Sequence, residues 1–225
     1  GKSRLYDHLT EEMKRAWISE VQKTEINPFT PVISSEEKFY TSYTQPAVLS
    51  NGSIVARKTS IDDITRIVLI DSTGNEENII NPGYMPDECL SASGNRICWA
   101  ELDQDPRWAL GNYSVIMVHD LNTGKTKQIT QKTRYFAPEF DSEGKKIAAV
   151  ETDESGQHFL VILDVFNGQV INRFPTPENY APSYPSWSPD GEKIALILGK
   201  DQGKGIAVLN LNKGTYEIVH NFSTY

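Results

Sequence analysis

The sequence predicts an all-β protein: a β-propeller of four consecutive four-stranded blades, preceded by a short helix. Two kinds of turn recur along the chain, and each is marked by glycines that lie between 42 and 50 residues apart. A period in the forties with four strands per unit is typical of propeller blades. The third strand of each unit is a continuous apolar run, which indicates that both of its faces are buried.

The first turn is clearest at Ser188-Pro189-Asp190-Gly191. Proline presets φ, aspartate can bond its own backbone, and glycine accepts a positive φ. The turn recurs at 42-, 50- and 47-residue spacings, with these glycines: Gly52, Gly94, Gly144 and Gly191. The second turn recurs at 50-, 44- and 46-residue spacings, with these: Gly74, Gly124, Gly168 and Gly214. Two independent landmarks with one period establish a repeat.

The apolar third strands fall at 67–70, 115–118, 160–163 and 206–209. A sheet with one wet face would alternate apolar and polar residues, whereas these runs do not alternate. Blades stacked face to face around an axis bury both faces of such strands. A single blade cannot bury either face alone, so the units need each other.

Residues 1–36 precede the repeat and predict a helix followed by an extended linker. Thr10 is the expected N-cap, and Glu11 and Glu12 suit the first turn of the helix. Apolar residues from Leu9 to Val21 fall near one helical face, so the helix should run over about 11–23. Two roles fit this helix: a cap that packs on the propeller, or a docking element for a partner.

Residues 37–225 form the expected partial propeller, with blades at about 43–80, 83–129, 136–174 and 185–219. Four blades leave it incomplete, or open, relative to a six-bladed ring. An open propeller exposes two blade faces and an unpaired strand edge. We therefore expect the open faces to drive homo-oligomer or swapped contacts.

The charge and composition of the chain exclude some classes of partner and location. The net charge of −8 repels a phosphate backbone, which argues against nucleic acid. No apolar run is long enough to span a membrane, and the chain begins without a signal-peptide pattern, as a processed chain or an excised piece would. Cys89 and Cys98 lie diagonally across one hairpin, either as two small buried residues or as a disulfide.

Familiar catalytic and metal-binding motifs are missing from the sequence. It has no G-x-S-x-G and no H-E-x-x-H, and its four histidines are isolated. Glu101, Asp103 and Asp105 lack the glycine and the distal glutamate of a calcium loop. We therefore expect no cofactor, no metal and no catalytic residue in this chain.

Two short stretches carry residues suited to contact a ligand. Asp105, Arg107 and Trp108 stand on one inter-strand loop, and loops on rigid scaffolds often carry sites. The alternative is that Trp108 covers a blade end while Arg107 pairs with Asp105. Arg134 and Tyr135 open the third blade, where the innermost strand should line the axial channel. The alternative for this pair is inter-blade packing with one hydrogen bond.

At 187–191 the W-S-P-D-G hairpin resembles the repeat of TolB-like (WD40-like) propellers, and prolyl-oligopeptidase propellers share a weaker form. The resemblance covers 43–220 and is degenerate outside the fourth blade. Four further strings, at 60–64, 105–108, 133–138 and 203–206, are similar to large Bacteroidetes proteins in which a gluzincin-like peptidase region precedes a TolB-like propeller. The resemblance implies a periplasmic or envelope location, a peptidase region upstream and further blades downstream. It implies no established catalytic residue in the propeller.

These observations favour a non-catalytic propeller module that binds a protein, peptide or glycan in an envelope protein. A second hypothesis makes the chain an accessory or gating propeller of a larger peptidase or hydrolase, whose catalytic domain lies outside it. A third is a propeller lyase with His and Tyr side chains that converge in the channel.

Overall fold

The computed structural model describes residues 2–24, 30–33, 39–86, 89–104, 112–201 and 203–224. The chain divides into two compact units, Gly1–Ser34 and Ser35–Tyr225. The first unit contains helix α1 (Lys2–Val21), and the second contains four sheets of four strands each. Among the described residues, no helix has both the length and the apolar character needed to cross a bilayer.

Helix α1 begins earlier than the sequence analysis placed it. It starts at Lys2, so Thr10 lies inside the helix and the prediction that it is the N-cap was wrong. The physical reason is that the apolar face of the helix extends one turn upstream of Leu9, the residue at which the sequence analysis began it. The members of this face recur every four residues: Leu5, Leu9, Met13, Trp17 and Val21.

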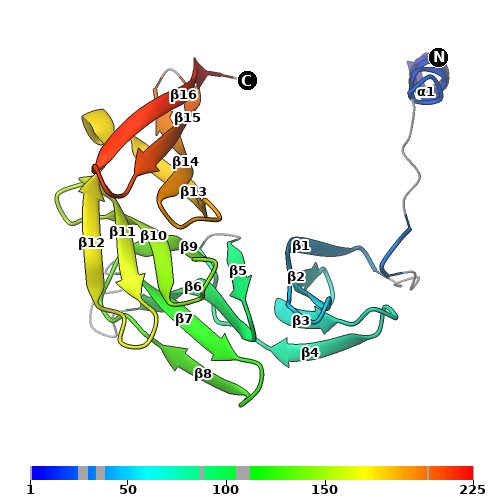
Figure 1. Cartoon of the computed structure of the whole chain (residues 1–225). Coiled ribbons are helices and arrows are strands. Elements are labelled where there is room, and N and C mark those ends of the chain that lie inside the picture. The colour runs from blue at the N-terminus through cyan, green and yellow to red at the C-terminus, as the bar shows by residue number, and fades with distance from the viewer. Residues whose placement is uncertain are drawn as a thin grey trace. The chain divides into compact units, whose positions relative to one another are not determined.

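Each sheet of the second unit is an antiparallel meander whose strands pair in chain order. The four sheets follow one another around the unit as propeller blades (Figure 1). Blade one is β1 (Thr41–Val48), β2 (Ile54–Ser60), β3 (Arg66–Ile70) and β4 (Glu76–Ile80). Blade two is β5 (Leu90–Ser93), β6 (Arg96–Gln104), β7 (Asn112–Asp120) and β8 (Lys125–Gln128). Blade three is β9 (Tyr135–Phe140), β10 (Lys146–Thr152), β11 (His158–Asp164) and β12 (Val170–Pro175). Blade four is β13 (Ala181–Trp187), β14 (Lys193–Lys200), β15 (Gly203–Asn210) and β16 (Thr215–Ser223).

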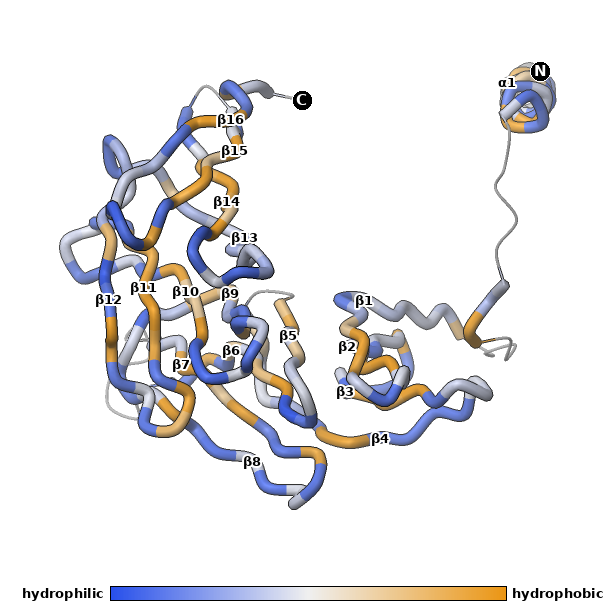
Figure 2. Tube along the Cα trace, viewed as in Figure 1, coloured by the Kyte–Doolittle hydropathy of each residue, from blue (hydrophilic) through white to orange (hydrophobic). Residues whose placement is uncertain are grey.

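Strand β11 shows how the blades bury one another. Leu160 and Ile162 lie in the core shared with blade four, whereas Val161 and Leu163 lie in the core shared with blade two. All four side chains are at most 2% exposed. The prediction that third strands are buried on both faces is confirmed for this blade, and hydrophobic residues mark the central strands of the other blades too (Figure 2).

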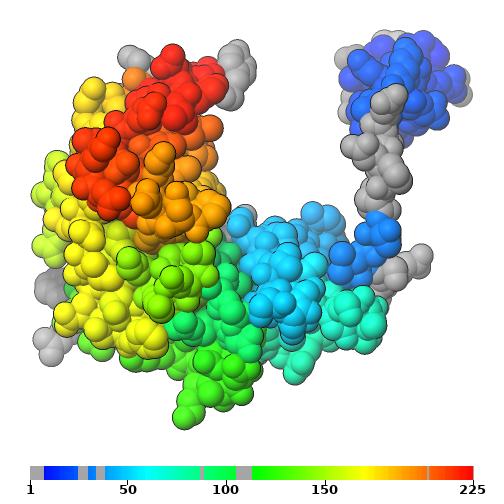
Figure 3. Space-filling view, in the orientation of Figure 1, coloured from blue at the N-terminus to red at the C-terminus, as the bar shows by residue number. Residues whose placement is uncertain are grey.

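Blade four has one covered face and one open face. Ala207 and Leu209 are fully buried against blade three, while Ile206, on the other face of β15, is 44% exposed. Ile206 is paired across the β14–β15 hairpin with Ile197. The corresponding pair in blade three is Leu160 and Val150, and both of these residues are buried. The forward face of blade four therefore carries the residues of an inter-blade interface. Blade four is the orange-to-red zone of Figure 3.

Aspartates organise several of the hairpin turns. In the β3–β4 turn, Asp71 Oδ1 accepts hydrogen bonds from the Thr73 amide at 2.8 Å, the Thr73 hydroxyl at 2.7 Å and the Asn75 amide at 2.9 Å. Asp153 makes the same three contacts in the β10–β11 turn, with Ser155 and Gln157. Such donors favour the ionised carboxylate. The Thr73 hydroxyl, followed by the Asn75 groups, lowers the pKa of Asp71 to about 2.

We expect Asp71→Asn to lower the melting temperature at neutral pH by an amount that vanishes in acid. Because the folded pKa of Asp71, about 2, lies below the unfolded value, the ionised side chain stabilises the fold fully only above the unfolded pKa. That contribution is lost as the pH falls from about 4 toward about 2. Thermal unfolding followed by circular dichroism between pH 7 and pH 2 would measure the gap between variant and wild type. A gap that does not change with pH would contradict the assignment, and Glu154→Gln is the control for a lost surface charge.

Candidate functional site

The structure places only two of the five residues that the sequence singled out. Asp105, Arg107 and Trp108 lie outside the described residues. Arg134 is exposed at the entrance to blade three, and its carbonyl accepts a hydrogen bond from the Thr152 amide at 3.4 Å.

Tyr135, the next residue, is buried between blades two and three with 7% of its surface exposed. The Ser114 hydroxyl donates to the Tyr135 carbonyl at 2.6 Å. Burial, followed by the nearby Glu151 carboxylate, raises the pKa of the Tyr135 phenol. Of the Arg134–Tyr135 pair, Arg134 is thus the member whose side chain solvent reaches.

The innermost strands of three blades share an unusual backbone feature. Gln45, Ala137 and Tyr184 have left-handed φ values of 55°, 48° and 50°. Each immediately precedes a proline, and each lies at a register shift in the pairing of its strand. Positive φ is costly for residues other than glycine, and bulges re-aim side chains. Such strain persists only where the surrounding structure imposes it, and it is frequent at functional sites.

Two of these strained residues, Ala137 and Tyr184, line one pocket of about 220 Å³ between blades three and four. Its walls come from β9, β10, the start of β11 and β13, with Cys89 from the segment before β5. Most wall residues are apolar, and Val150 and Cys89 are at least nine-tenths buried. Cys89 and Cys98 form no disulfide with each other, and both are buried.

Two polar residues of this pocket, Thr152 and His158, are hydrogen-bonded to each other. His158 Nδ1 shares a hydrogen bond with the Thr152 hydroxyl at 3.0 Å. The His158 amide donates to Asn179 Oδ1 at 2.7 Å, and the Thr176 amide donates to the His158 carbonyl at 3.1 Å. No hydrogen bond to the other ring nitrogen, Nε2, comes from the part of the chain that the structure describes. The Thr152 hydroxyl therefore orients the imidazole, and the two other bonds hold the His158 backbone.

The sequence analysis missed this pocket because it treated each histidine as isolated. His158 and Thr152 are six residues apart, and they meet because the β10–β11 hairpin pairs them directly. A second signal in the sequence was a proline in the first strand of three blades, directly after the residue that adopts a left-handed φ. Ala137-Pro138 and Tyr184-Pro185 are 47 residues apart, which is the period of the turns.

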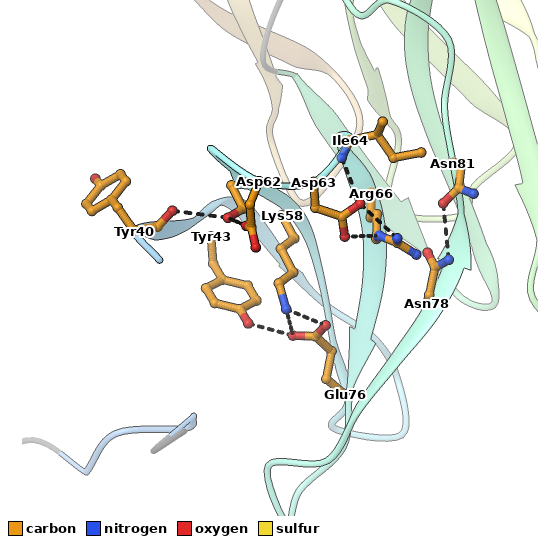
Figure 4. Close-up of polar contacts among 11 residues, drawn as sticks. Tyr40, Tyr43, Lys58, Asp62, Asp63, Ile64, Arg66, Glu76, Asn78 and Asn81 are labelled. Carbon is orange, nitrogen blue, oxygen red and sulfur yellow. Dashed lines mark hydrogen bonds and ion pairs between the residues drawn. The ribbon is translucent and has the colours of Figure 1, made fainter. Parts of the chain in front are cut away.

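A second polar cluster covers the face of blade one that points away from blade two (Figure 4). The Tyr43 hydroxyl donates to Glu76 at 2.6 Å, and Lys58 Nζ donates to the same carboxylate at 2.9 Å. On this face Ala56 and Val68 pair across β2 and β3 and are at most 1% exposed. Both charges are satisfied within the cluster, which indicates a polar cover for apolar strand residues.

The described residues contain no group of three or more His, Cys, Asp or Glu side chains arranged to hold a metal ion. Glu101, one of the acids weighed for calcium, has a structural role. Its Oε1 accepts from the Trp99 indole N–H at 2.7 Å and from the Gly83 amide at 2.9 Å. Asp105, another of those acids, lies outside the described residues.

Comparison with solved structures decides the type of propeller. TolB from Acinetobacter baumannii superposes with a TM-score of 0.64 and 23% sequence identity, over 84% of this chain and 45% of TolB. The chain folds as a TolB-like β-propeller. The β-propeller domain of the Trilobed protease from Pyrococcus furiosus, described as having an open velcro topology, matches this TolB-like propeller with a TM-score of 0.54 and 18% identity, over 84% of the chain and 59% of that domain.

Among curated proteins, the uncharacterized peptidase YuxL of Bacillus subtilis is 26% identical to this TolB-like propeller over 148 residues. That stretch is 64% of this chain and 20% of YuxL. No protein-family model matches the sequence. The chain thus spans a fifth of the curated relative and less than half of TolB.

Proposed function

We propose that the chain is a non-catalytic binding module that engages a protein, peptide or glycan through the inner strands of its propeller. The pocket between blades three and four carries this proposal. It combines apolar walls, an oriented imidazole and two strained backbone positions, Ala137 and Tyr184. Concave apolar sites with a few placed polar groups are the usual form of ligand-binding sites. An acidic chain with a net charge of −8 is a poor match for nucleic acid.

The proposal is tested by binding of the labelled chain to protein, peptide and glycan arrays. We expect reproducible binding that weakens when Ser183, on the pocket wall, is replaced by tryptophan to fill the pocket. Circular dichroism would verify that this variant keeps its β structure. The proposal fails if the arrays bind nothing, or if the purified wild-type chain cleaves array members and an internal substitution abolishes the cleavage.

A second candidate is that the propeller serves a larger peptidase. The similarity to YuxL and to the Trilobed protease propeller supports it. The reading frame that contains these 225 residues discriminates between the two functions. An H-E-x-x-H motif upstream or a G-x-S-x-G motif downstream would favour the peptidase.

We also propose an envelope or periplasmic location, which the likeness to TolB supports. The Bacteroidetes assignment rests on the four sequence strings at 60–64, 105–108, 133–138 and 203–206. Fractionation of the source cells, with the native protein followed by antibody, tests the location. Recovery in the cytoplasmic fraction would overturn it.

We further propose that copies of the chain associate through the forward face of blade four, where Ile206 is 44% exposed. We expect the average mass in sedimentation velocity to rise with concentration. Ile206→Lys should keep the chain monomeric, because a charge on this face opposes apolar contact. Val170→Lys, at a 46% exposed position on outer strand β12, is the matched control and should associate like wild type. Equal behaviour of the two variants would contradict this proposal.

A further inference from the structure

We propose that the pocket between blades three and four takes one aromatic side chain from an extended peptide. This inference rests on the proposed binding function and names the ligand class. It depends on the volume of the pocket, on the chemistry of its walls, and on the strand edges beside it.

The volume limits the ligand to a single side chain. The cavity is about 220 Å³, whereas sites for drug-sized molecules occupy roughly 300–1,000 Å³. A phenyl or phenol ring fits within such a space, since an engineered apolar cavity of about 150 Å³ binds benzene. A larger ligand must therefore keep most of its atoms outside the pocket.

The walls favour an apolar ring over a sugar or an anion. Phe136, Val150 and Pro182 present carbon surface, and Pro182 is buried within β13. The polar wall residues are few, namely Thr152, His158, Ser183 and Tyr184, so most hydroxyls of a buried sugar would lack partners. A buried polar group without a partner costs free energy. An aromatic ring gains from contact with Phe136 and Tyr184, since rings prefer edge-to-face or offset contact with one another. His158 Nε2 can exchange a hydrogen bond with a phenol or with the peptide backbone.

The adjacent strand edges discourage recognition by strand addition. β9 and β13 each pair on one side only, which leaves an edge of each strand unpaired within its sheet. Pro138, Pro182 and Pro185 interrupt these edges, and proline has no N–H to donate to an added strand. A peptide that runs along the inner strands therefore cannot form a continuous ladder, and side-chain insertion is the remaining specific contact.

The left-handed residues prepare the pocket in advance. The bulge at Tyr184 leaves its side chain 53% exposed at the pocket, while Pro182 and Pro185 on either side are buried. Ala137, at the equivalent position in β9, is 6% exposed and presents only a methyl group. A small residue on one strand and a ring on the other leave space for a third ring. A rigid pocket binds with less loss of conformational entropy than one that must form on binding.

A series of blocked peptides tests the inference: Ac-Gly-Gly-X-Gly-Gly-NH₂ with Phe, Tyr, Leu, Ala or Glu at X. The chain is labelled at its alanine and valine methyl groups, and Ala137 and Val150 report on the pocket. We expect the Phe and Tyr peptides to shift these two signals and to bind roughly tenfold or more tightly than the Ala and Glu peptides, because the ring buries more apolar surface.

Variants of the pocket complete the test. Tyr184→Ala should weaken Phe-peptide binding roughly tenfold, whereas Tyr40→Ala, at a 75% exposed tyrosine before β1, should leave it unchanged. His158→Phe keeps a ring but removes both nitrogens, so it should weaken binding of the Tyr peptide more than binding of the Phe peptide. Equal affinities across the series, shifts confined to other methyl groups, or no binding of any peptide would overturn the inference. Array binding that is insensitive to Tyr184→Ala would overturn it while leaving the proposed binding function intact.

Discussion

Replacement of Trp99 by alanine is expected to lower the free energy of unfolding by about 3–5 kcal/mol, as truncation of a buried aromatic residue commonly does. Trp99 is fully buried in the core between blades one and two, with Val55 and Ile67 in the same cluster. Its indole N–H donates to Glu101 at 2.7 Å, so the variant also removes a partner from that carboxylate. Domains of this size are stable by only about 5–15 kcal/mol, so the loss is a large part of the total.

Urea denaturation followed by circular dichroism measures this effect. Trp17→Ala is the matched control, because Trp17 lies on α1 with 65% of its surface exposed. A surface substitution of this kind should change stability by no more than about 0.5 kcal/mol. If Trp99→Ala and Trp17→Ala had the same small effect, blades one and two would not share the core described here.

The blade architecture was predictable because it depends on local chemistry that repeats. Each turn needs a residue with positive φ, and glycines supply it at a constant period. Both faces of a third strand such as 160–163 are apolar because both meet another blade. Both requirements can be recognised in the sequence as regularly spaced glycines and apolar runs. The observed sheets follow the predicted order.

The pocket was not predictable in the same way, because its parts come from three blades. Cys89, His158 and Tyr184 are far apart in the sequence and converge only through inter-blade packing. Its shape also depends on left-handed backbone at Ala137 and Tyr184, and non-glycine residues rarely adopt it. Arg134, which the sequence did single out, lies beside the pocket through its hydrogen bond with Thr152.

Gly168→Ala should destabilise the propeller much more than Gly124→Ala, although the two glycines occupy equivalent turns. Gly124 and Gly168 have φ values of +65° and +70°, and each donates its amide to an aspartate carbonyl at 2.8 Å. Alanine in this conformation costs about 1–2 kcal/mol at either position. A Cβ at Gly124 would meet nothing within 4 Å, whereas a Cβ at Gly168 would lie 1.8 Å from the Ile129 carbonyl oxygen.

The clash at Gly168 cannot be relieved by rotating a side chain, because the obstacle is the backbone of blade two. Ile129 is also held by its amide, which donates to the Ile116 carbonyl at 2.9 Å. Moving it would disturb the core between blades two and three, and forced shifts of this kind cost about 1–3 kcal/mol. Urea midpoints of the two variants therefore report on this contact by their difference. If Gly168→Ala lost no more stability than Gly124→Ala, the β11–β12 turn would not pack against blade two, and the radial arrangement of the blades would need revision at that interface.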